Sequence, residues 1–534
     1  MFPFALLLSP LHMELSNFQS LAYFYPELIL SGFLVLLFLV DLIPGSRAVL
    51  GPRSEIPRSN GDLPDRPYHG RRTANNSSLL AGLTLVGLGL ALLSVVRMFP
   101  TEGYWLFHKM VAVDNFALFF KVIFALSTFL IVVISLRSRE IIPVEQGEYY
   151  SLLLAITLAM MLFASATNLL MVYMALEMVS VISYVLSGYL KTTRKSSEAA
   201  LKYCIYGGVA SGVMIYGISL IYGLTGTLSF TEVQAALAQQ DRPQALAVSV
   251  AVILMLAGFG YKIASVPFHM WAPDVYEGAP TPITAFFSIG PKAAGFAAMI
   301  RFFYEALSLP SSEHPGTWTA LSHLEWPMLM AIISAVTMTL GNLVALVQNN
   351  LKRLLAYSSI AHVGYILMGF SVLTNEGIRA MLFYLVVYLI MNLGAFLVVI
   401  YVSNQLGSEE ISGYTGLAWR MPYLACAMGV FLFSLTGIPP LAGFVGKFFL
   451  FAAVIEEKLY WLAVIGLLNS VVSLYYYARI IKAMFLDEAT ERTQVPRQPL
   501  YDGLIGVLMA LTVLFGVYWS PLFRWADHSL SFLR

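Results

Sequence analysis

Residues 260–292 read GYKIASVPFHMWAPDVYEGAPTPITAFFSIGPK, an apolar helix that carries a lysine, is interrupted by prolines and then resumes. An ionisable group inside hydrocarbon is costly and usually functional. A helix broken at membrane depth persists only where protein or water satisfies its freed backbone groups. We therefore expect ion chemistry in this segment, with Lys262 before the break and Lys292 after it.

The whole chain has the composition of a polytopic membrane protein. Its 534 residues are 58% hydrophobic and 11% charged, and the mean hydropathy is +0.76, whereas soluble domains carry about 25% charged residues. The sequence predicts an all-α membrane protein with about 14 crossings, if each proline-broken pair counts as one. The predicted crossings are residues 21–42, 79–96, 111–136, 150–165, 169–190, 199–223, 246–287, 293–304, 328–346, 354–370, 378–402, 423–454, 461–484 and 504–519.

Two of these crossings, 246–287 and 423–454, are broken by prolines, and each is the fourth in a group of five. Because five is odd, successive groups enter the membrane from opposite faces, which is the inverted-repeat plan of many transporters. The sequence thus predicts two inverted five-helix repeats between flanking helices. The expected segments are three N-terminal helices over 1–148 with a cytoplasmic insert at 44–76, a first repeat over 149–307, a second over 308–486 and a C-terminal helix over 487–534.

Lysine and arginine residues are concentrated in the odd-numbered loops between the predicted crossings. The insert at 44–76 is rich in arginine, and the loop at 305–326 has no basic residue. The positive-inside rule therefore places the odd-numbered loops in the cytoplasm and both termini outside. The apolar run before Leu21 has no basic segment, so no cleaved signal peptide is expected, and Met13 is an alternative start.

Charge and cysteine content exclude some classes of function. A net charge of +1 offers no basic stripe for nucleic acid. Cys204 and Cys426 lie far apart in apolar helices and predict neither a disulfide framework nor a thiolate metal site. Walker loops, Cys-x-x-Cys pairs and closely spaced histidine pairs are absent from the sequence. We expect an ion pathway without its own energy source.

Glu177 and Lys262 are the expected central pair of that pathway. Glu177 lies near the middle of the crossing at 169–190, and Lys262 is the only cation on its crossing before the break. Burial disfavours the charged amine, while an approaching carboxylate restores it. Movement of Glu177 relative to Lys262 would thus load or release a proton. The alternatives are a protonated, purely structural glutamate and a lysine that reaches an interface.

Lys292 and Lys447 extend the series. Lys292 opens the crossing after the first break and could relay protons between the repeats, although a lysine near a helix end can also reach the interface. Lys447 occupies the second broken helix much as Lys262 occupies the first. Asp114 and Lys121 share a helix face and are interpreted as a structural pair.

Four further residues are candidates with open alternatives. His269, Tyr357 and His362 can pass protons through hydrogen-bonded water, but a histidine in an apolar helix is often a packing residue. Lys202 lies near a helix end and could feed protons inward or anchor the topology. For Lys352, beside Arg353, anchoring is the favoured interpretation.

Three motifs carry a resemblance to a known family. They are the 262–292 segment, GNLVALVQNNLKRLLAYSSIAH at 341–362 and GIPPLAGFVGK at 437–447. Together they closely resemble the antiporter-like subunit N of proton-pumping NADH:quinone oxidoreductase, which is bacterial complex I or NDH-1, with mitochondrial subunit 2 as counterpart. Lys447 is unlike the glutamate usual in sister subunit M, and the long lateral helix of subunit L is absent.

The resemblance implies roles for these residues. Glu177 and Lys262 match the family's central ion pair, and Lys202, Lys292 and Lys447 match its intramembrane lysine axis. His269 and Tyr357, and also His362, match positions associated with proton transfer. NADH, FMN, iron–sulfur clusters and quinone would be bound by partner subunits, with no cofactor in this chain.

The resemblance further implies M-type and small K-, J- and A-type membrane subunits as neighbours, together with lipids, in the bacterial plasma membrane. A stand-alone or Mrp-type sodium/proton antiporter subunit is the alternative function, and a scaffold with idle lysines is a third. The electron donor, NADH or ferredoxin, is left open.

Overall fold

The computed structural model describes residues 15–42, 74–141, 146–239, 245–321, 325–488 and 497–530, with the side chains of residues 74–77 excluded. The predicted insert at 44–76 and the alternative start at Met13 lie outside the described residues, apart from the backbone of 74–76. Within these ranges the chain is mostly helical and includes two antiparallel hairpins. The hairpins pair β1 (Tyr104–Leu106) with β2 (Val111–Val113) and β3 (Ser308–Pro310) with β4 (Trp318–Ala320).

Twelve helices among the described residues are long and apolar enough to cross a membrane. The all-α polytopic fold is therefore confirmed, whereas the count of about 14 crossings is not. The crossings expected at 354–370 and 423–454 are not among the twelve. The first corresponds to α14 (Leu351–Phe370), which has a polar face, and the second divides into α17 (Pro422–Thr436) and α18 (Ala442–Glu456), each of 15 residues.

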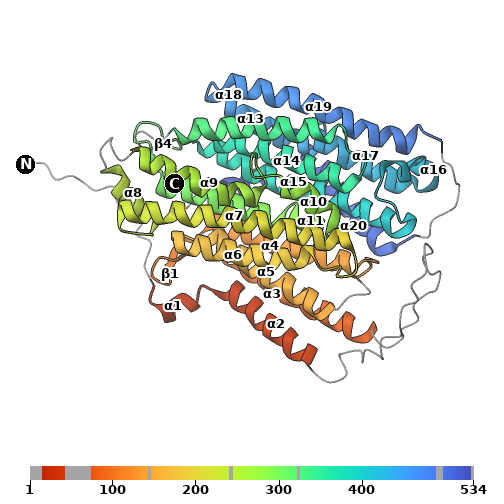
Figure 1. Cartoon of the computed structure of the whole chain (residues 1–534), viewed down its shortest axis with the longest axis horizontal. Helices are drawn as coiled ribbons and strands as arrows, with labels where there is room; N and C mark the ends of the chain where they lie inside the picture. Colours follow the sequence, from red (N-terminus) through yellow and green to blue (C-terminus); the bar gives the residue numbers. More distant parts are fainter. Residues whose placement is uncertain are drawn as a thin grey trace, which may run out of the picture.

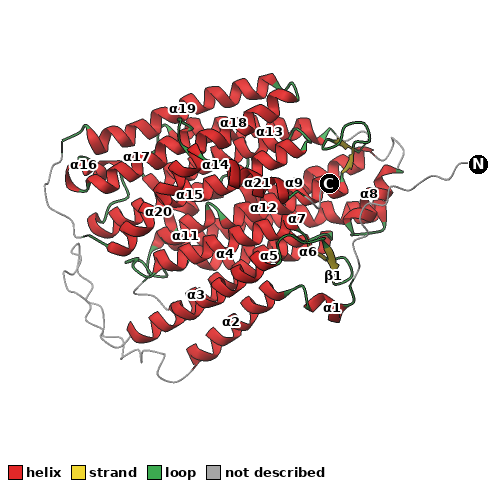
Figure 2. Cartoon of the chain, turned by 180° about the vertical axis from the view of Figure 1, so that it is seen from behind, coloured by secondary structure: helices red, strands yellow, loops and turns green. Residues whose placement is uncertain are grey.

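The long helices run roughly parallel, with the N-terminal helices at one edge of the molecule and α18 with α19 (Tyr460–Phe485) at the other (Figure 1). The same order is seen from behind in Figure 2. The N-terminal elements are α1 (Asn17–Leu21), α2 (Tyr25–Leu42), α3 (Ala74–Arg97) and α4 (Asn115–Ser135).

Buried charges join the N-terminal helices to one another and to the rest of the bundle. Lys121 of α4 lies 2.6 Å from Glu27 of α2, and both side chains are fully buried. Asp114, the N-cap of α4, instead binds Arg301 far along the chain. The expectation that Asp114 and Lys121 form one structural pair is therefore wrong, because each has an opposite charge on a different neighbouring helix.

The next group of helices contains the first break. Its elements are α5 (Gln146–Ser165), α6 (Leu169–Ser187), α7 (Arg194–Thr225), α8 (Phe230–Ala238), α9 (Ala245–Ile263), α10 (Trp271–Gly278), α11 (Thr281–Phe287) and α12 (Gly290–Ala306). The expected broken crossing at 246–287 is too long at its C-terminal end, since α11 and α12 together form one span over Thr281–Ala306. The reason is local: Pro280 and Pro282 end α10 and start a new helix.

The remaining group contains the second break. Its elements are α13 (Trp326–Ala345), α14, α15 (Asn375–Leu406), the short 3-10 helix η2 (Ile411–Tyr414), α16 (Leu417–Arg420), α17, α18 and α19, followed by α20 (Pro499–Val517) and α21 (Ser520–His528). Gly437 ends α17 with a positive φ of 93°. Glycine adopts this conformation without a Cβ clash, so α17 stops here and α18 starts anew.

Burial identifies the centre of the bundle. The span Thr281–Ala306 is wholly buried and 94% of the α15 window is buried, against 22% for α2 and 28% for α20. A helix that is apolar and buried on all sides belongs to an interior, whatever solvent surrounds the molecule. Polar side chains on α12, α14 and α15 must therefore find partners inside the protein.

Candidate functional site

Three of the predicted lysines are buried in the helix bundle. Lys262 is 1% exposed, Lys292 is 3% exposed and Lys447 is 4% exposed. Each ammonium donates to a neutral oxygen, and none has a carboxylate within 4.0 Å in the described part of the chain. Each ammonium is therefore held by hydroxyl or carbonyl dipoles rather than by an ion pair.

Lys262 lies one residue before the end of α9, directly before the break. Its Nζ donates to Ser180 Oγ of α6 at 2.9 Å. Glu177 is three residues earlier on α6, a spacing that puts both residues on one side of the helix. Among the described residues, the Glu177 carboxylate forms no ion pair with Lys262, whose ammonium contacts the neighbouring Ser180 instead.

Glu177 is half-buried and lies between the exposed residues Met174 and Met178 on the outer side of α6. The geometry therefore places the carboxylate at the boundary of this chain and the ammonium inside it.

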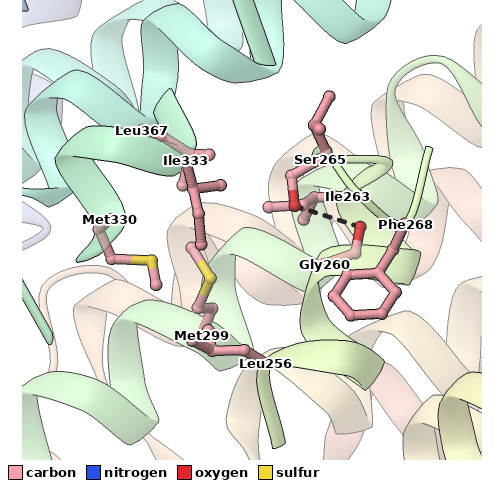
Figure 3. A pocket seen from close by; sticks show the side chains of 10 residues that line it. Leu256, Gly260, Ile263, Ser265, Phe268, Met299, Met330, Ile333 and Leu367 are labelled. Carbon is pink, nitrogen blue, oxygen red and sulfur yellow. Dashed lines mark hydrogen bonds between the residues drawn. The ribbon is translucent and has the colours of Figure 1, made fainter. Parts of the chain in front are cut away.

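The first break is held by side chains and contains space. Ala264 has a positive φ of 61°, and the backbone N–H of Val266 donates to Thr337 Oγ1 at 3.1 Å. Beside it, Figure 3 shows a small, mainly apolar cavity that reaches Met330 and Leu367, with room for about one water molecule. Two polar groups border it: Ser265 Oγ donates to the Gly260 carbonyl at 3.5 Å.

His269 lies in the loop between α9 and α10. It is 3% exposed, and its Nδ1 has no hydrogen-bond partner among the described residues. Buried polar atoms are nearly always satisfied, so this nitrogen is an exception among the described residues.

Lys292 is the third residue of α12, and its Nζ donates to Ser359 Oγ of α14 at 2.6 Å. A second small cavity lies against this pair and is bordered by Ser288 and Tyr388. The hydroxyl of Tyr388 is buried and has no described partner. Lys292 therefore has one direct acceptor, Ser359, and the cavity beside it is bordered by a tyrosine hydroxyl without a described hydrogen-bond partner.

One face of α14 leads from Lys292 towards Lys447. Ser359, His362 and Tyr365 follow each other at intervals of three and share this face. His362 Nδ1 and Tyr384 Oη are 2.7 Å apart, and Ser470 Oγ donates to Tyr365 Oη at 3.1 Å.

Lys447 completes the row. Its Nζ donates to Ser470 Oγ at 3.2 Å and to the carbonyl of Thr436 at 2.8 Å, and it lies 4.3 Å from the centre of the Tyr365 ring. Lys447 lies after the break in the second broken helix, whereas Lys262 lies before the break in the first. The two lysines therefore do not occupy equivalent positions, although the sequence suggested that they would.

Two predicted residues lie apart from this row. Lys202 has a side chain that is 38% exposed and pairs with Asp274 at 2.5 Å and Glu198 at 2.8 Å. Tyr357 is half-buried on α14, among the apolar side chains packed against the core. Lys352, in contrast, is 2% exposed and is inside the protein.

Sequence reasoning missed the hydroxyl partners of the lysines. Ser180, Ser359 and Ser470 are ordinary serines in apolar helices, and nothing local marks them. The spacing of Ser359, His362 and Tyr365 is the one signal that could have indicated a polar face on α14.

Two broken helices, three buried lysines and the polar face of α14 between Lys292 and Lys447 define an antiporter-like membrane protein. The family described as NADH:quinone oxidoreductase/Mrp antiporter, TM, matches residues 166–473. The NADH-quinone oxidoreductase subunit N of Anaeromyxobacter sp. (strain Fw109-5) is 46% identical over 97% of this chain and 98% of its own.

Two solved structures are also similar to this chain. A chain of respiratory complex I from Thermus thermophilus with bound aureothin is 30% identical, with a TM-score of 0.72 over 93% of this chain and 98% of that one. A chain of the Mrp complex from Dietzia sp. DQ12-45-1b shares the fold at 20% identity, with a TM-score of 0.78 over 97% of this chain and 98% of that one. The chain belongs to the NADH-quinone oxidoreductase subunit N family, which confirms the resemblance of its motifs.

Proposed function

We propose that this chain moves protons across the membrane as a subunit of a respiratory NADH:quinone oxidoreductase. The observation that carries the proposal is the row of three buried lysines bound only to hydroxyl and carbonyl oxygens. A buried amine without a carboxylate gains and loses a proton at small cost, and its proton affinity changes when a charge approaches.

Glu177 supplies that charge in the proposed cycle. When the carboxylate contacts Lys262 the amine holds its proton, and when Lys262 returns to Ser180 the proton is free to leave. His269 and the water-sized cavity beside the break favour a route around Lys262. His362 and Tyr384 continue it between Lys292 and Lys447. Lys202 and Tyr357 would serve at the margins of this route.

The energy for this cycle would come from other subunits. We infer that NADH, FMN, iron–sulfur clusters and quinone are bound there, and that M-type and small K-, J- and A-type subunits adjoin this chain. The half-exposed position of Glu177 supports a neighbour on that side, since a carboxylate facing lipid is costly. The proposed location is the bacterial plasma membrane, with both termini periplasmic and the two five-helix repeats inverted.

Lys262→Ala in the assembled complex tests this function. In inverted membrane vesicles we expect NADH-driven proton uptake per complex to fall at least about tenfold, as for loss of a proton-transferring group. Lys482→Ala is the control, because Lys482 is an exposed lysine of α19 that pairs with Asp487 at 3.2 Å. Proton uptake at the wild-type rate in Lys262→Ala would falsify the assigned role.

A sodium/proton antiporter of the Mrp type is the second candidate, favoured by the shared fold. Sodium prefers several oxygen ligands, whereas the row described above is lined by ammonium groups. Sodium-dependent proton exchange by the isolated chain, without NADH, would support this candidate instead.

A further inference from the structure

Two carboxylates on the short helix α10 each bind two cations, one on α7 and one on α14, through different oxygens. Asp274 binds Arg353 of α14 at 2.6 Å through Oδ1 and Lys202 of α7 at 2.5 Å through Oδ2. Glu277 binds Arg353 at 2.9 Å through Oε2 and Lys195 of α7 at 2.8 Å through Oε1. We call these five residues the α10 clamp.

Arg353, Asp274 and Glu277 form the half-buried part of the clamp, whereas the side chains of Lys195 and Lys202 are 72% and 38% exposed. The exposed fractions of the side chains are 28% for Arg353, 30% for Asp274 and 20% for Glu277. A guanidinium group is a rigid fork of donors and can hold two carboxylates at once, whereas a lysine ammonium is a single point charge. Water competes less with such a network than with an isolated surface pair.

Lys352 strengthens the same junction from the neighbouring position on α14. Its buried ammonium donates to the carbonyl of Ala279, the C-cap of α10, at 2.9 Å and pairs with Glu409 at 3.1 Å. The C-terminal end of a helix carries partial negative charge, so a cation there is stabilising. The first turn of α14 therefore holds α10 through both its side chains and its terminus.

The clamp and the Lys292 site are two contacts between the same two stretches of chain. Arg353 and Ser359 are six residues apart on α14, about 9 Å along the axis. Glu277 and Lys292 are joined by the short helix α11, which follows Pro280, and by the start of α12, where Pro291 is the second residue. Sliding α10 along α14 would therefore change the distance between Lys292 and Ser359.

We propose that Arg353 is a positioning residue for proton transfer: through Asp274 and Glu277 it fixes α10 against α14 and thereby sets the contact between Lys292 and Ser359. The inference rests on the proposed function, because it assigns to the clamp an effect on the lysine row. Arg353 itself transfers no proton in this scheme, and its described hydrogen bonds go to Asp274, Glu277 and Gln348 rather than to Lys262, Lys292 or Lys447.

The experiment measures NADH-driven proton uptake into inverted vesicles, per assembled complex, for Arg353→Gln, Arg353→Lys, a double variant Asp274→Asn/Glu277→Gln and the triple combination. Arg379→Gln is the matched control, because Arg379 is 22% exposed and also holds two carboxylates, Asp527 at 3.0 Å and Glu376 at 3.4 Å. We expect Arg353→Gln to lower proton uptake at least about threefold, since small misplacements of reacting groups are costly.

The pattern across variants distinguishes positioning from simple stability. Arg353→Lys should restore part of the rate, and the triple variant should be no slower than the slower of its two parents, because all three residues act as one unit. Wild-type proton uptake in Arg353→Gln overturns the inference. Additive losses of proton uptake in the triple variant also overturn the inference. Failure of the Arg353→Lys complex to assemble overturns it as well, since the arginine would then be needed for folding alone.

The outcome is separable from that of the proposed function. If Lys262→Ala stops proton uptake while Arg353→Gln does not change it, the clamp inference fails and the lysine row stands. If Lys262→Ala leaves proton uptake unchanged, the proposed function fails whatever the clamp variants do.

Discussion

Lys447 donates a hydrogen bond to the carbonyl oxygen of Thr436 at 2.8 Å and so binds the C-terminal end of α17 across the second break. Thr436 is the last residue of that helix, where carbonyl groups have no partner within the helix. The partial negative charge of this end stabilises an ammonium that has no carboxylate beside it. The broken helix therefore provides the binding site for its own lysine.

Gly437→Ala should disturb this arrangement directly. A Cβ at Gly437 would lie 2.9 Å from Lys447 Cδ, and the backbone φ is 93°. We expect lower proton uptake per complex and a loss of ~1 to 2 kcal/mol in stability from the strained backbone. Gly407→Ala is the control, because it has a φ of 68° but nothing within 4 Å of the added atom. Equal effects of the two substitutions would show that strain, not displacement of Lys447, is responsible.

Ser359→Ala should slow proton transfer at Lys292. It removes the 2.6 Å acceptor of the ammonium, and a hydrogen bond to a charged group contributes ~1.5 kcal/mol or more, which is about tenfold in rate. Proton uptake in vesicles is the measurement. Ser371→Ala is the control, since Ser371 lies just after the same helix and its hydroxyl donates only to the local carbonyl of Met368. An unaltered rate in Ser359→Ala would remove this serine from the pathway.

Glu177→Gln keeps the shape of the side chain and removes a negative charge that lies one helical turn before Ser180, the partner of Lys262. We expect proton uptake to fall at least about tenfold while the complex still assembles. Glu376→Gln serves as comparison, because Glu376 is a partly exposed glutamate near the start of α15. Retention of full proton uptake would mean that Lys262 changes its proton affinity without a carboxylate.

Asp114→Ala should destabilise the chain rather than slow proton transfer. The carboxylate accepts from Arg301 at 2.8 and 2.9 Å and from the backbone N–H of Ala117 at 2.7 Å. Its loss leaves a buried guanidinium with Glu305 as its remaining carboxylate, at a cost of ~3 kcal/mol. The melting temperature of the purified complex should fall. Glu313→Ala, in an exposed loop, should leave it unchanged. A melting temperature as high as wild type in Asp114→Ala would contradict a stabilising role.

Much of the architecture could be predicted because it depends on local sequence. Stretches of apolar residues near membrane length indicate helices, and prolines at 267, 280, 282, 439 and 440 indicate the breaks. The error at 246–287 arose because hydropathy does not say which side of a break a short helix joins. Lys202 was predicted beside the buried lysines, yet Glu198 one turn earlier already offered it a local partner.

The sequence by itself determined that ionisable groups enter the membrane and where the helices carrying them are interrupted, since hydropathy and proline act over neighbouring residues. Only the tertiary structure decided which oxygen each ammonium contacts: Ser180 lies 82 positions from Lys262, and Ser359 lies 67 from Lys292. It also decided that Arg353, a plain basic residue in sequence, joins α10 to α14. Such contacts depend on how helices distant in the chain pack together, and no local pattern records that packing.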